Sequence, residues 1–240
     1  MTGFFTKIEE TEEIRQGDII RKLNSKTGVV EKLGVIITAD CDIAQRKASE
    51  RYTWLEIMPM SAYIEGPWAR EQLRKLSEKR SRALCDYLNG QIRKQHTGLL
   101  DLTHDSLVEW LQSKSAEDIL ASVVGQVPSS DNKQLCELKG LELTVCDDEK
   151  QSNLTRLKEA WTFFNINESK QQEFVRSALK DGGGFQDYFV LPELPQQAGI
   201  GFVVMLRSMG TIMATELYFS EQNARIYDRL SLIHISEPTR

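Results

Sequence analysis

Two aspartates, Asp40 and Asp42, stand two positions apart, just after the run of apolar and β-branched residues at 35–38. Divalent cations such as Mg²⁺ and Mn²⁺ prefer carboxylate oxygens, and a strand end holds such groups on a rigid base. The spacing therefore permits a metal site for phosphotransfer or hydrolysis. The same residues also suit a turn, because Asp side chains accept hydrogen bonds from nearby backbone N–H groups and cap helix starts. We expect the turn, with Asp42 as a helix N-cap, and keep the metal site as the alternative.

A second group of candidate residues is basic and lies between residues 70 and 94. This segment has eight Lys or Arg and three Asp or Glu, in a chain whose formal net charge is −5. Its leucines recur at helical spacing, which predicts an amphipathic helix. Four basic residues project from the opposite face: Lys75, Lys79, Arg82 and Arg93. Such a stripe suits nucleic-acid phosphates, but acidic residues on the same face favour a solvated surface with ion pairs.

Nucleophilic catalysis has weaker support in the sequence. Asp105 and Ser106 directly follow His104, and adjacent residues on a helix do not face one another, so the three cannot form a triad. Thr103 is instead expected to cap a helix that begins at His104, and Ser115 with Asp118 resembles a capping box at the start of a further helix. Because no base, nucleophile and charge stabiliser stand together, the sequence favours a protein without catalytic activity. No cofactor is expected, and Mg²⁺ or Mn²⁺ enters only if the two aspartates bind metal.

Strands are expected at both ends of the chain, with helices between them. Alternating and continuous apolar runs predict strands within residues 14–64, and the run at 34–38 is expected to be buried on both faces. Helices are predicted within residues 68–125, at 153–164 and at 168–180. Further strands are predicted at 135–146, 185–194, 199–210 and 214–220. This order predicts an α+β fold in which N- and C-terminal strands build one small barrel or sheet.

The N-terminal strands resemble those of the MazF/PemK toxin superfamily. The residues that carry the resemblance are Gly17-Asp18-Ile19 at a first strand, 34–40 at a second, and 57–61, which resemble the Pro-Ile-Thr/Ser end of a further strand. The resemblance implies an SH3-like barrel and, for most of that family, cleavage of RNA without a metal.

The sequence departs from the family pattern at the position of the catalytic arginine. The catalytic Arg of the family falls on Leu33-Gly34 here, while Ser61 matches a position used near the scissile phosphate. Without that Arg, charge developing on the phosphate lacks a stabiliser. We therefore take the resemblance for the fold, and RNA binding or cleavage remains an alternative function.

Five segments are expected along the chain: an N-terminal β segment (1–66), a helical segment (67–126), a strand with two helices (127–184), a C-terminal β segment (185–229) and a tail (230–240). The tail, "LSLIHISEPTR", resembles the translation of a sequencing-library adapter. Native sequence is therefore expected to stop near Arg229, with the C-terminal β segment truncated.

Composition and charge narrow the class of protein. The chain of 240 residues is 40% apolar and 27% charged, which is typical of a globular protein, and its net charge argues against polyanion binding by bulk attraction. No apolar run reaches the roughly 20 residues that span a bilayer. A cytoplasmic protein without a membrane partner is expected. We predict a non-catalytic binding or regulatory module of a bacterial toxin-like or defence-associated protein, with a protein partner favoured over RNA.

Overall fold

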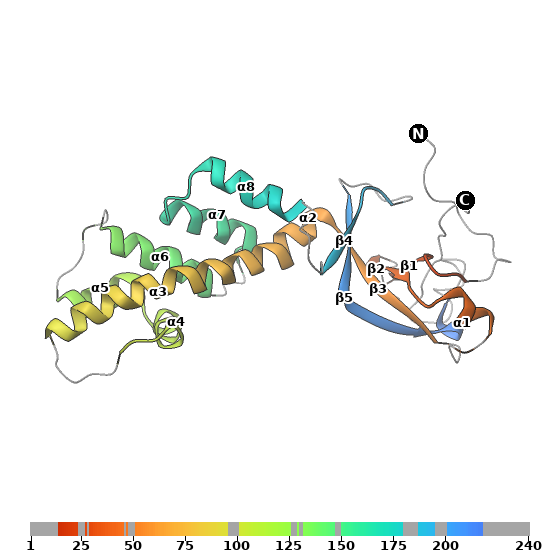
Figure 1. Ribbon diagram of the computed structural model, residues 1–240, viewed down its shortest axis with the longest axis horizontal. Coiled ribbons are helices and arrows are strands. Elements are labelled where there is room, and N and C mark those ends of the chain that lie inside the picture. The colour runs from red at the N-terminus through yellow and green to blue at the C-terminus, as the bar shows by residue number, and fades with distance from the viewer. Residues whose placement is uncertain are drawn as a thin grey trace. The chain divides into compact units, whose positions relative to one another are not determined.

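The computed structural model describes residues 14–23, 27, 29–45, 47, 51–95, 101–125, 129, 132–146, 150–179, 187–194 and 201–217. The adapter-like tail at 230–240 lies outside these described residues. The chain is α+β and divides into two compact units (Figure 1). We call residues 1–63 with 182–240 the sheet unit, and residues 64–181 the helical unit. In the described part of either unit, no helix has the length and apolarity needed to cross a membrane.

The sheet unit holds one five-stranded antiparallel sheet in the order β1-β2-β3-β5-β4 (Figure 1). Its strands are β1 (Ile19–Leu23), β2 (Val30–Ile36), β3 (Arg51–Pro59), β4 (Tyr188–Leu191) and β5 (Phe202–Met213). β3 pairs with β5 along its whole length, from Arg51 opposite Met213 to Pro59 opposite Phe202. Strands from both ends of the chain therefore share one sheet, as predicted. Within the described residues the sheet is open, with β1 and β4 at its edges.

Apolar side chains are buried on both faces of this sheet. Successive side chains of a strand point to opposite faces, so the neighbours Ile19 and Ile20 belong to different buried clusters. One cluster contains Ile19, Leu33, Leu55, Ile57, Leu194, Phe202 and Val204, and the other contains Ile20, Ile36 and Ile212. Burial on both faces explains the continuous apolar run that follows Gly34.

Trp54 of β3 lies against two glycines on the neighbouring strands. A Cβ added to Gly34 of β2 would stand 2.3 Å from Trp54 Cε3, and one added to Gly210 of β5 would stand 2.6 Å from Trp54 Cε2. Real Cβ atoms essentially never approach another heavy atom so closely. The indole thus occupies the space that side chains at both positions would need.

The described helical unit consists of six α-helices, preceded by a π-helical segment at Ile64–Trp68. The helices are α3 (Ala69–Gln95), α4 (His104–Ser113), α5 (Ala116–Val124), α6 (Lys133–Val145), α7 (Asn153–Phe163) and α8 (Glu168–Leu179). α3 packs against α4, α5, α6 and α7. The predicted caps are confirmed: Thr103 Oγ1 accepts from Ser106 N–H, and Ser115 Oγ accepts from Asp118 N–H.

The strand predicted at residues 135–146 is wrong, because these residues form most of α6. Asn132 caps the helix, and its Oδ1 accepts from the N–H groups of Gln134 and Leu135 at 2.9 and 3.2 Å. Leu135, Leu138 and Leu141 are buried at a spacing of three residues, which places them on one helical face. This burial outweighs the strand-like alternation of the last residues of the helix.

The strand predicted at 214–220 is also wrong where the structure describes it. Residues Ala214–Glu216 form a short 3-10 helix directly after β5. Glu216 turns back, and its carboxylate accepts a hydrogen bond from Met213 N–H at 3.0 Å. That contact closes a turn directly after β5, so residues 214–216 do not form the separate strand that their composition predicts.

Candidate functional site

Asp40 and Asp42 lie in a short helix, α1 (Asp40–Ala44), of the sheet unit. The N-cap is Ala39, and the N–H of Asp42 donates to its carbonyl at 2.9 Å. The prediction that Asp42 caps this helix is therefore wrong, because the chain turns before Asp40. Asp40 Oδ1 instead accepts a hydrogen bond from Gln16 N–H at 2.6 Å, which joins α1 to the segment before β1. The described residues hold no group of three or more His, Cys, Asp and Glu suited to a metal ion.

Ser61 lies far from these aspartates within the sheet unit. It is exposed on the short helix α2 (Met60–Tyr63), which directly follows the end of β3. α1 follows β2, whose last residue Ile36 pairs with Trp54 near the start of β3. At about 3.3 Å per strand residue, Ser61 and Asp40 are separated by roughly 20 Å. The sequence-predicted candidates of the sheet unit therefore do not form one site.

The four basic candidates are placed along α3, and their surroundings differ. Lys75 Nζ lies 3.6 Å from a carboxylate oxygen of Glu71, and Arg93 is paired with Asp101. Lys79 and Arg82 are exposed, with no ion pair to any residue that the structure describes. The stripe is thus interrupted by ion pairs, and two of its members keep unpaired charge.

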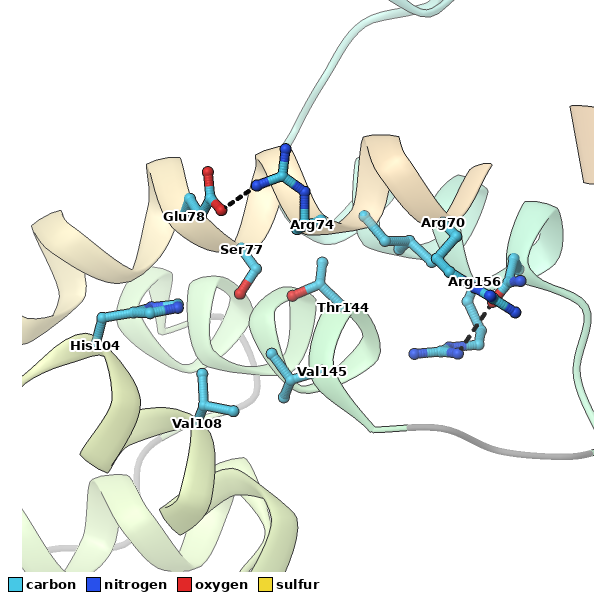
Figure 2. A pocket seen from close by; sticks show the side chains of 11 residues that line it. Arg70, Arg74, Ser77, Glu78, His104, Val108, Thr144, Val145 and Arg156 are labelled. Atoms are coloured by element: carbon cyan, nitrogen blue, oxygen red, sulfur yellow. Dashed lines mark hydrogen bonds and ion pairs between the residues drawn. The ribbon is translucent and has the colours of Figure 1, made fainter. Parts of the chain in front are cut away.

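A pocket of about 340 Å³ lies in the helical unit between α3, α4, α6 and α7 (Figure 2). α3 contributes five lining residues at positions 70, 73, 74, 77 and 78, which share one helical face. The full lining is Arg70, Leu73, Arg74, Ser77, Glu78, His104, Val108, Thr144, Val145, Asn153 and Arg156. We call this the arginine pocket.

Three guanidinium groups give the arginine pocket its chemistry. Arg156 is only 4% exposed, and its Nε donates to the carbonyl of Leu143 at 3.1 Å, so it ties the start of α7 to the end of α6. Arg74 is held by carboxylates of α3, and the hydrogen bond that it donates to Glu71 raises the pKa of Arg74. Arg70 is exposed and has no hydrogen bond or ion pair to the described residues. Its guanidinium is therefore available to a ligand.

His104 forms a hydrogen bond with a serine beside the pocket. The Nδ1 of His104 lies 2.7 Å from Ser81 Oγ, which resembles the pairing of base and nucleophile in covalent catalysis. Ser81, however, is fully buried, so a substrate does not reach its oxygen. The hydrogen bond instead anchors the first residue of α4 to α3.

The arginine pocket is suited to bind an anion. Among the residues that the structure describes, its lining carries three arginines and one carboxylate, that of Glu78. Planar guanidinium groups bind phosphate or carboxylate oxygens through paired hydrogen bonds. Figure 2 shows Arg70 and Arg156 at one end of the pocket and His104 at the other, with Ser77 and Thr144 between them. A ligand would therefore contact charge at one end and hydroxyl groups along its length.

The arginine pocket is absent from the sequence predictions. The spacing from Arg70 to Glu78 indicates one face of a helix, but no local pattern links that face to His104, Thr144 or Arg156. Comparison of the chain with protein-family models, curated proteins and solved structures found no match. The function is therefore inferred from the geometry and from the resemblance of the N-terminal strands.

Proposed function

We propose that this protein is a non-catalytic binding or regulatory module whose arginine pocket holds a phosphate-bearing small molecule. The observation that carries the proposal is the meeting of Arg70 and Arg156 at one end of a cavity of about 340 Å³, whose lining also includes Arg74. This volume lies within the range of about 300–1,000 Å³ typical of ligand pockets. Glu71 and Glu78 pair with Arg74, so Arg70 and Arg156 leave the described lining of the pocket with net positive charge inside an acidic chain.

Two observations support a role without catalysis. Ser81, the hydrogen-bond partner of His104, is fully buried, and Asp40 lies at the opposite end of β3 from Ser61. A reaction needs its groups within hydrogen-bonding distance of one substrate. Binding needs only the convergent guanidinium groups, which the helical unit has.

The proposal also covers the sheet unit and the cellular role. We propose that the five antiparallel strands form an SH3-like barrel that is open between β1 and β4. The register shift between Leu55 and Glu56 supports this, because extra residues in one strand increase the local twist of a sheet. The assignment to a cytoplasmic toxin-like or defence-associated protein rests on the MazF/PemK resemblance.

Calorimetric titration with inorganic pyrophosphate tests the arginine pocket. We expect saturable binding that weakens with added salt, and a loss of about tenfold in affinity for Arg70→Gln. Arg82→Gln is the matched control, because Arg82 is also exposed on α3 and does not line the pocket. Equal losses in the two variants, or no binding by the wild type, would refute the proposal.

Expression in a bacterial host tests the absence of catalysis. We expect normal growth and intact cellular RNA. RNA cleavage lost in Ser61→Ala would favour the MazF/PemK-like alternative.

Thermal melting of the purified protein tests the metal site. A Mg²⁺- or Mn²⁺-dependent rise in melting temperature, lost in both Asp40→Asn and Asp42→Asn, would favour the metal-dependent phosphotransferase or hydrolase.

A further inference from the structure

A second pocket lies in the helical unit and shares no lining residue with the arginine pocket. It has a volume of about 200 Å³ and is lined by Gln72, Lys75, Leu76, Lys79, Arg80, Ile166, Lys170 and Phe174. Its residues come from α3, from α8 and from the segment between α7 and α8. We call it the lysine pocket.

The floor of the lysine pocket is apolar. Leu76, Ile166 and Phe174 supply its aliphatic and aromatic surface. The ring of Phe174 stacks on Trp161 of α7, with ring centroids 5.9 Å apart and an interplanar angle of 13°. Because this stacking holds the Phe174 ring in place, the pocket presents a positioned aromatic surface. Such a floor suits an aromatic ring, which gains from both contact area and ring packing.

The rim of the lysine pocket is cationic and only partly neutralised. Lys75 is paired with Glu71. Arg80 Nη1 lies 3.3 Å from Glu137 Oε1, and Arg80 Cζ lies 4.8 Å from the ring centre of Phe164. Lys79 and Lys170 are exposed and have no ion pair to the residues that the structure describes. None of the described lining residues carries a carboxylate. Two ammonium groups are therefore free to bind an anion beside an apolar floor.

We infer that the lysine pocket binds a small aromatic carboxylate, with its ring on the floor and its carboxylate between Lys79 and Lys170. Size supports this occupant, since an apolar cavity of about 150 Å³ holds benzene and this pocket has about 200 Å³. Charge supports it as well, because four cationic side chains surround the cavity in a chain of net charge −5. The described lining of the arginine pocket is more polar and includes no Phe, Tyr or Trp, so that pocket suits a different ligand.

Titration of the full chain with phenylacetate tests this inference. Tryptophan fluorescence is the readout, because Trp161 contacts the Phe174 ring. We expect saturable binding by phenylacetate and at least about tenfold weaker binding by benzyl alcohol, which lacks the charge, and by acetate, which lacks the ring. The double variant Lys79→Gln with Lys170→Gln should also lose about tenfold in affinity.

Matched controls separate this site from general charge effects and from the proposed function. The variant Lys133→Gln with Lys158→Gln removes two exposed lysines outside the pocket, and Arg70→Gln alters only the arginine pocket. Both should bind phenylacetate as the wild type does. No saturable binding, equal binding of benzyl alcohol, or equal losses in both lysine double variants would overturn the inference. RNA binding that depends on Lys79 and Lys170, without phenylacetate binding, would overturn it in favour of RNA phosphates.

Discussion

The sheet unit and the helical unit place their polar side chains in different ways. In the sheet unit, Asp40 and Ser61 stand at opposite ends of β3. Asp40 accepts a hydrogen bond from Gln16 N–H, and Ser61 faces solvent. In the helical unit, residues from 70 to 156 meet around one cavity. Local spacing in the sequence thus identified turns and caps, while the convergent groups arise from the packing of helices that are distant in sequence.

The two units also differ in where charge is tolerated. The strands bury apolar side chains on both faces of the sheet, and charged strand residues pair across neighbouring strands, as Lys32 does with Glu56. A helix such as α3 buries one face and leaves the rest of its circumference polar. Leu73 and Leu76 of α3 are both buried, yet each borders a different pocket. One long helix can therefore supply two sites of different chemistry.

The largest predicted effects on the free energy of unfolding come from replacing a glycine by alanine, once in each unit. Gly34→Ala in β2 should lower the free energy of unfolding by about 1–3 kcal/mol, because the new Cβ collides with Trp54. Gly90→Ala in α3 should raise it by about 0.5–1 kcal/mol, because its Cβ meets nothing within 4 Å and alanine favours the helix. Urea unfolding measures both changes.

A double variant distinguishes the collision from a loss of backbone freedom. Trp54→Leu removes the indole, so in that background Gly34→Ala should cost much less than in the wild type. An unchanged cost would show that the glycine is needed for its backbone rather than for space.

A smaller effect on stability is predicted for removing the cap of α4, in contrast to the side chain that was wrongly expected to cap α1. Thr103→Ala should lower the free energy of unfolding by about 1 kcal/mol, since Thr103 Oγ1 accepts from Ser106 N–H at the start of α4. Asp42→Ala should change it by less than about 0.5 kcal/mol, because Asp42 lies inside α1 and caps nothing. Thermal unfolding of both variants checks this difference, and equal costs would contradict it.

The smallest effects concern two glutamates of the helical unit. A hydrogen bond from Lys139 lowers the pKa of Glu117 below its ordinary value of 4.5, whereas burial raises the pKa of Glu142 above the same value. Glu117 therefore contributes stability above pH 4.5 that is lost as the pH falls through its lowered pKa. Glu142 contributes stability below pH 4.5 that is lost as the pH rises through its raised pKa.

Melting temperatures measured against pH distinguish the two carboxylates. Glu117→Gln should be less stable than the wild type at neutral pH, with the difference closing in acid. Glu142→Gln should gain on the wild type as the pH rises above 4.5. The same trend in both variants would contradict the opposite pKa directions.

Much of the fold could be predicted from local patterns. Apolar runs located the strands, and capping residues such as Thr103 and Ser115 located the starts of α4 and α5. The prediction failed at α6, where a short alternation competes with leucines at helical spacing, and tertiary burial decides between them. Neither pocket could be predicted, because Arg70 and Arg156 meet only through the packing of α3, α6 and α7.

The contact of Trp54 with two glycines has a consequence for recognising this sheet in other chains. Gly34, Trp54 and Gly210 lie on three adjacent strands, and no one of them can enlarge while the others stay fixed. In a relative, a larger residue at either glycine position requires a smaller one in place of the tryptophan. The three positions should therefore covary, and this linked set would identify the same sheet in sequences too divergent to align by overall similarity.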